Sequence, residues 1–124
     1  LLGPQAGDAA RSSVCASIGA LRADSYSKAV RAAVAFDRTA VLPSIRARVL
    51  LLSGEHDRLV PPQMMRTMQA TIKNSEFYVL PGTGHMLNLE NPELFNYRLS
   101  AFITRNARAD GGQSGASFPR EGQT

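Results

Sequence analysis

The sequence predicts an α/β fold in which parallel strands alternate with helices. Two short apolar runs, at residues 49–52 and 77–80, have the length of strands. Between them, Met64, Met68 and Ile72 follow one another at helical spacing. A helix that connects two strands of one sheet makes a crossover, and strands joined by a crossover are parallel. The chain is therefore expected to contain a strand, helix, strand unit with further helices beside it.

The first strand is expected to lie deep in the fold. Residues 49–52 are apolar without interruption, a pattern typical of a strand that is covered on both faces. The polar residues 53–57 end this strand. Pro61 and Pro62 then suit the first turn of a helix, where a missing N–H costs little. The second strand leads into a glycine-rich loop at residues 81–85.

Two further helices are predicted, one before this unit and one after it. The first covers residues 25–37, and its apolar side is expected to face the core. This side consists of Tyr26, Val30, Ala33 and Val34. The second begins after Asn91, a good N-cap, with Pro92 as its first residue, and its pattern fades near Asn106. Its buried stripe is expected to consist of Phe95, Leu99, Phe102 and Ile103.

Composition argues against several classes of protein. The chain has 124 residues, 44% of them hydrophobic, which lies within the range of one domain. Its net charge of +4 comes largely from scattered arginines, and aromatic residues make up 6%, so no nucleic-acid surface is predicted. No apolar run approaches the roughly 20 residues that cross a bilayer. Cys15 has no partner for a disulfide and the sequence does not begin with a signal peptide, so we expect a cytoplasmic protein.

Asp57 and His85 are the candidate catalytic residues. Each follows one of the two predicted strands, and the loops at the carboxyl ends of neighbouring parallel strands share one crevice. Strands in a sheet lie about 4.8 Å apart, so the carboxylate is expected to reach an imidazole nitrogen. Asp57 would fix the tautomer of His85, and His85 would act as a general base, a role that suits histidine side chains because they exchange protons near neutral pH.

These two loops resemble the last third of an α/β-hydrolase. Gly54 and Asp57 match the G-x-x-D turn that carries the acid of that family, and Gly84 and His85 match its G-H pair, which carries the base. The resemblance covers roughly residues 25–105. The stretches Phe-Asp-Arg at 36–38 and Asn-Leu-Glu-Asn-Pro at 88–92 are similar to those of enol-lactonases and small esterases.

The resemblance implies a serine-type hydrolase with no cofactor and no metal, acting on a small-molecule carboxylic ester or lactone. Met86 and Leu87 adjoin the base and are expected to contact the substrate. The chain then divides into three regions. Residues 1–40 are a helical segment that leads into the core or derives from a lid, residues 41–106 are the core segment, and residues 107–124 are a disordered polar tail, since burial cannot offset their ordering entropy.

No nucleophile of the family pattern is found in the chain. The family places it before the acid and the base, on a G-x-S-x-G elbow between a strand and a helix. Ser114 lies in a similar stretch but after the base, and Cys15 and Ser17 precede the acid without following a strand. The nucleophile is therefore expected before Leu1, and residues 1–124 alone, without this half of the fold, are predicted to be inactive.

The same residues allow other interpretations. His56 and Glu55 offer metal-ligating groups next to the pair, but His56 and Asp57 are consecutive and would tend to diverge. The methionines at 64, 65 and 68 are expected to fill the core rather than line a pocket. An isolated aspartate after a strand commonly caps a turn. The alternative function is accordingly a non-catalytic binding or regulatory relative that lacks the nucleophile.

Overall fold

A computed structural model of the chain describes residues 1–110. It contains, in order, the helices α1 (Asp8–Gly19) and α2 (Ala23–Ala35), the 3-10 helix η1 (Thr39–Ser44), strand β1 (Val49–Gly54), helix α3 (Pro62–Thr71), strand β2 (Ser75–Leu80), and helices α4 (Leu87–Glu90) and α5 (Pro92–Asp110). The predicted strand, helix, strand unit is present as β1, α3 and β2. Each strand is two residues longer than its apolar run.

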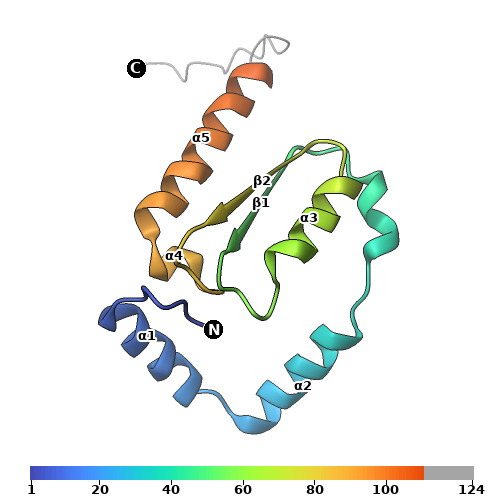
Figure 1. Cartoon of the computed structure of the whole chain (residues 1–124). Helices are drawn as coiled ribbons and strands as arrows, with labels where there is room; N and C mark the ends of the chain where they lie inside the picture. Colours follow the sequence, from blue (N-terminus) through green and yellow to red (C-terminus); the bar gives the residue numbers. More distant parts are fainter. Residues whose placement is uncertain (111–124) are drawn as a thin grey trace, which may run out of the picture.

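The two strands are parallel neighbours, as the crossover predicts. Their register pairs Val49 with Ser75 at one end and Gly54 with Leu80 at the other. Both strands therefore end at the same edge of the sheet. The loops that follow them, with Asp57 and His85, leave from that edge (Figure 1).

The two faces of the strand pair are covered by different helices. Arg66 of α3 lies over the ring of Phe77, which places α3 on that side of β2. The alternate residue Tyr78 lies under Arg98 of α5, with the guanidinium carbon 4.3 Å from the ring centre. Side chains alternate along a strand, so α3 and α5 cover opposite faces. Figure 1 shows α5 running beside β2 and α3 beside the pair.

The buried apolar core of the strand, helix, strand unit is small. Leu51, Ile72 and Leu80 are its buried apolar side chains in this unit, and Ser53 is buried with them. Leu50 and Leu52 are only half-buried, so the continuous apolar run of β1 is less deeply covered than predicted. Leu52 is paired in register with Tyr78, so the thinner cover lies on the face toward α5.

The helix predicted at 25–37 is present as α2, but its core-facing role is wrong. Tyr26 and Val30 are exposed, and Ala33 is exposed as well. Figure 1 shows the reason, since α2 lies apart from the strands, on the stretch of chain that leads from α1 back to η1. Helical spacing predicts which side of a helix is apolar, but it does not specify what surface covers that side.

The last helix also differs from its predicted extent. Asn91 caps it as predicted, because its Oδ1 accepts a hydrogen bond from the N–H of Leu94 at 3.0 Å. The helix continues to Asp110 instead of ending near Asn106. In the predicted stripe, Phe95 and Phe102 are half-buried while Leu99 and Ile103 are exposed. Residues 111–124, which hold Ser114 and most of the predicted tail, lie outside the described residues.

The sequence predicts a helical segment over residues 1–40 without bounds for its first helix, and it does not predict α4. The segment before residue 25, where apolar spacing is loose, contains the 12-residue helix α1 with Val14 buried on it. The four-residue helix α4 lies directly after the loop that carries His85. Among residues 1–110, no helix is both long enough and apolar enough to cross a membrane.

Candidate active site

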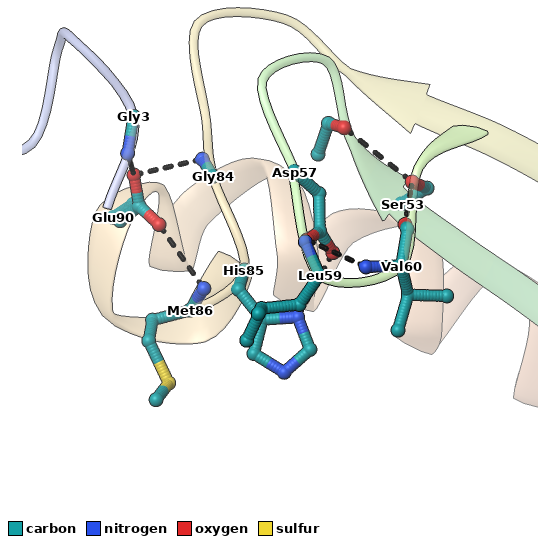
Figure 2. Close-up of polar contacts among 10 residues, drawn as sticks. Gly3, Ser53, Asp57, Leu59, Val60, Gly84, His85, Met86 and Glu90 are labelled. Carbon is teal, nitrogen blue, oxygen red and sulfur yellow. Dashed lines mark hydrogen bonds and ion pairs between the residues drawn. The ribbon is translucent and has the colours of Figure 1, made fainter. Parts of the chain in front are cut away.

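The structure brings the two predicted residues into contact. Nδ1 of His85 lies 2.9 Å from Oδ2 of Asp57 (Figure 2). The side chain of Asp57 is 6% exposed and that of His85 is 35% exposed. The predicted meeting of a carboxylate and an imidazole at one edge of a parallel sheet is confirmed. The roles of the two residues in a reaction stay predictions.

Asp57 is fixed by its own turn. Its Oδ1 accepts hydrogen bonds from the N–H groups of Leu59 at 2.8 Å and Val60 at 3.0 Å. Its backbone N–H donates to the carbonyl of Gly54 at 3.2 Å. One carboxylate oxygen is therefore occupied by the backbone, and the other is directed at His85. This is the turn-capping role expected of an aspartate after a strand, combined with a contact to the imidazole.

Burial and hydrogen bonding act on the Asp57 carboxylate in opposite directions. Burial favours the neutral acid and by itself raises the pKa of Asp57. The hydrogen bonds from Val60, His85 and Leu59, with the charge of His85, outweigh burial and hold the pKa of Asp57 below its ordinary value. Asp57 is therefore an ionised acceptor at neutral pH.

The two ring nitrogens of His85 have different surroundings. Nδ1 faces Asp57, while Nε2 points away from it, out of the loops (Figure 2). An ionised carboxylate accepts hydrogen bonds and donates none. A neutral His85 therefore carries its proton on Nδ1, the nitrogen that faces Asp57. Its Nε2 then carries a lone pair directed outward. This arrangement can accept a proton at Nε2 while the carboxylate stabilises the resulting imidazolium.

The loop of the base lies against the end of β1 at very short range. The N–H of His56 donates to the carbonyl of Thr83 at 2.8 Å, and the N–H of Glu55 to that of Leu80 at 3.0 Å. A Cβ added at Gly54 would overlap the backbone oxygens of Gly84 and Thr83. Glycine at 54 is thus required by the close approach of the two loops.

Carboxylates of other residues hold the loop of the base. Glu90 accepts hydrogen bonds from the N–H groups of Gly84 at 2.9 Å and Met86 at 3.1 Å. Glu55 accepts one from the N–H of Gly82 at 2.8 Å, where the chain turns with a φ of 70°. From the sequence, Glu55 was considered only as a metal ligand and Glu90 was given no role. The available signal was a glutamate a few residues after a histidine, at the end of the Asn-Leu-Glu stretch.

The predicted substrate contacts, Met86 and Leu87, directly follow His85. Both are half-buried, and Leu87 is the first residue of α4. Their contact with a substrate stays a prediction. A cavity of about 780 Å³ opens beside Asp57, between the residues at 1–4 and the loop of the acid, and Arg11, His56 and Arg58 contribute its basic groups.

The alternative site residues do not join the pair. His56 directs its Nε2 toward Glu55, 3.7 Å from Oε2, instead of toward His85. In the part of the chain that the structure describes, no three His, Cys, Asp or Glu side chains are placed to hold a metal ion. Cys15 and Ser17 are exposed on α1, and neither shares a hydrogen bond with His85 within residues 1–110.

Comparison with known proteins points to one fold family. The sequence model of the alpha/beta hydrolase fold matches residues 10–92. YugF of Bacillus subtilis, an uncharacterized hydrolase, is 37% identical over 62 residues, which are 50% of this chain and 23% of YugF. The chain therefore spans about a quarter of the length of this relative.

Two solved structures share the same part of the fold. A thermophilic esterase from Thermogutta terrifontis superposes with a TM-score of 0.53 and 33% identity, over 54% of this chain and 25% of the esterase. The proline iminopeptidase of Mycobacterium smegmatis superposes with a TM-score of 0.57 and 31% identity, over 60% of this chain and 24% of that enzyme.

Proposed function

The chain belongs to the alpha/beta hydrolase fold family, and from this premise we propose that Asp57 and His85 are the acid and the base of a serine-type hydrolase. The observation that carries the proposal is the 2.9 Å contact between Nδ1 of His85 and Oδ2 of Asp57. The proposed substrate is a small-molecule carboxylic ester or lactone. Likeness to the Thermogutta esterase supports the ester, and the similarity to enol-lactonases supports the lactone.

The proposed reaction has two halves, formation of an acyl-enzyme and its hydrolysis, and His85 moves one proton in each half. Its Nε2 takes the proton of a serine hydroxyl as the serine oxygen bonds to the acyl carbon. The bond from that carbon to the alcohol oxygen then breaks, and the alcohol leaves with the proton from Nε2. A water repeats the sequence on the acyl-enzyme, which releases the carboxylic acid and restores the serine. With a lactone, the alcohol and the acid stay in one product.

Asp57 would act through His85 in both halves. Its bond to Nδ1 keeps the proton there, so Nε2 begins each half as an acceptor. Its ionised state, favoured by the turn that lowers the pKa of Asp57, stabilises the imidazolium. The serine is proposed to precede Leu1 in the protein. Residues 1–124 by themselves are proposed to supply an acid and a base without the covalent step.

The test compares the two histidines of the chain in the intact protein. His85→Ala is expected to lower kcat on a nitrophenyl ester by at least about 1000-fold, because a triad without its base loses this much or more. His56→Ala is the matched control, since His56 is exposed in the neighbouring loop and its ring faces Glu55. Wild-type turnover in His85→Ala would reject the proposed role of His85.

A second measurement concerns residues 1–124 alone. They are expected to hydrolyse the same ester no faster than buffer. Turnover that disappears in Cys15→Ala would show that Cys15 is a nucleophile and would contradict the proposed position of the serine.

A further inference from the structure

Glu90 binds the backbone on both sides of His85. Its Oε2 accepts the N–H of Gly84 at 2.9 Å, and its Oε1 accepts the N–H of Met86 at 3.1 Å. The same Oε2 accepts the N–H of Gly3 at 2.6 Å, from the first turn of the chain. Figure 2 shows the carboxylate between these three amides, next to the loop from which the imidazole projects.

The short helix α4 places this carboxylate. Glu90 is its last residue, and the N–H of Glu90 donates to the carbonyl of Met86 at 3.0 Å. Glu90 therefore binds both backbone groups of Met86: its own N–H binds the carbonyl, and its side chain binds the N–H. The N–H of His85 itself donates to the carbonyl of Leu1 at 2.6 Å. Three consecutive amides, those of Gly84, His85 and Met86, are thus engaged.

The backbone matters for the ring because the ring has few constraints of its own. The side chain of His85 is 35% exposed, and its one hydrogen bond within residues 1–110 is the bond to Asp57. A rotation of the peptide on either side of His85 would move Nδ1 away from the carboxylate. Asp57 cannot follow, because its other oxygen is held by Leu59 and Val60.

A carboxylate suits three converging N–H groups better than any neutral side chain. Its two oxygens offer about four acceptor positions and no donor. Hydrogen bonds to a charged acceptor are roughly twice as strong as neutral ones. Glutamine has one acceptor oxygen and would present an NH₂ group to at least one of the three amides. The acceptor set of Glu90 is therefore matched to the donors that it faces.

We propose that Glu90 is a positioning residue that fixes the direction of the His85 ring, and through it the contact with Asp57. Its effect on turnover rests on the proposed function, whereas its effect on the ring is independent of any reaction. Removal of Glu90 releases two of the three amides that hold the loop, and the ring then samples orientations in which Nδ1 does not meet Asp57.

The experiment compares Glu90→Ala and Glu90→Gln with Glu93→Ala in the intact protein. Glu93 is a matched control, because it is an exposed glutamate in the first turn of α5, three residues away. Nitrogen-15 spectra of the histidine side chains report which ring nitrogen carries the proton. We expect one Nδ1–H tautomer of His85 in the wild type and in Glu93→Ala, a mixture in Glu90→Ala, and a smaller change in Glu90→Gln.

Turnover provides the second readout. A base displaced by about 1 Å costs on the order of 100-fold, so kcat is expected to fall about 10- to 100-fold in Glu90→Ala, with KM changed less than about threefold. Glu90→Gln is expected to recover part of this loss, since one oxygen still accepts. Unchanged tautomers in Glu90→Ala would overturn the proposal.

The remaining outcomes are also decisive. If Glu90→Ala does not fold, Glu90→Gln is read instead, and wild-type tautomers and kcat in that variant would overturn the proposal. If His85→Ala keeps full turnover, the proposed function fails, while the spectra still report whether Glu90 directs the ring.

Discussion

The two loops that meet at the edge of the sheet are held in opposite ways. The loop of Asp57 is held by the functional side chain itself, whose Oδ1 accepts the N–H groups of Leu59 and Val60. The loop of His85 is held by other residues, since Glu90 and Glu55 bind its amides and its imidazole binds none of them.

This difference follows from the chemistry of the two side chains. A carboxylate has two oxygens, so it can cap its turn with one and meet the base with the other. An imidazole that gives Nδ1 to the acid and keeps Nε2 for a proton has no atom left for its own loop. The acid can therefore be positioned locally, whereas the base needs acceptors from elsewhere in the chain. Variants that separate or release the two loops test this comparison.

The largest effect is expected from Gly54→Ala, which acts on both loops together. The added Cβ would overlap the backbone oxygens of Gly84 and Thr83, and backbone atoms cannot turn aside as a side chain can. We expect the free energy of unfolding to fall by about 3 kcal/mol or more. The bond between Asp57 and His85 should be lost as well. Urea unfolding and the histidine nitrogen spectra measure the two effects.

Gly19→Ala is the control for this variant. Gly19 is the last residue of α1, and a Cβ there would meet no atom within 4 Å. Its stability should stay within about 0.5 kcal/mol of the wild type. Equal stability of the Gly54 and Gly19 variants would show that the two loops separate without cost.

Asp57→Ala tests whether the acid holds its own loop. It leaves the amides of Leu59 and Val60 without their acceptor, so the free energy of unfolding at pH 7 should fall by about 2 kcal/mol. The folded-state pKa of Asp57 lies below the unfolded value of about 3.9, so its stabilising effect is complete above about pH 4. It is lost as the pH falls through the folded-state pKa. The difference between wild type and variant should therefore narrow toward pH 2.

Urea unfolding at pH 7, 4 and 2.5 measures this difference. Asp24→Ala serves as the control, because Asp24 is exposed in the first turn of α2, outside both loops. A difference in unfolding free energy between wild type and Asp57→Ala that stays constant down to pH 2.5 would mean that the ionised form contributes nothing. The turn would then be held by its backbone alone.

The strand pair was predictable from the sequence because its signals are local. An apolar run, a proline at a helix start and a polar turn each act within a few residues. The crossover rule then fixes the relative direction of β1 and β2. Helix α2 was predicted less well. The amphipathic pattern of Tyr26 and Val30 marks an apolar side without specifying what covers it, and both side chains are exposed.

In the candidate site, too, the residues marked by local sequence signals were predicted and the others were not. Asp57 and His85 were predicted because each is fixed to the end of a strand, so their meeting follows from topology. Glu90 and Glu55 were missed because their contacts depend on backbone N–H groups, which every residue carries and which no spacing marks. The contact between the first segment of the chain and the loop of the base was missed for the same reason. Leu1 accepts the N–H of His85 with its carbonyl, an atom common to all residues.

The smallest effect is expected from Glu55→Gln, which sharpens the comparison between the two glutamates of the base loop. The side chain of Glu55 is 53% exposed and holds one amide, that of Gly82. A glutamine keeps an oxygen for this single donor, so the free energy of unfolding should change by less than about 0.5 kcal/mol. The contact between Oε2 of Glu55 and Nε2 of His56 is 3.7 Å long and exposed, so it adds little to stability. The His85 tautomer should stay as in the wild type, whereas Glu90→Gln alters it. A tautomer change as large as that of Glu90→Gln would show that both carboxylates direct the ring, and the special position of Glu90 would be lost.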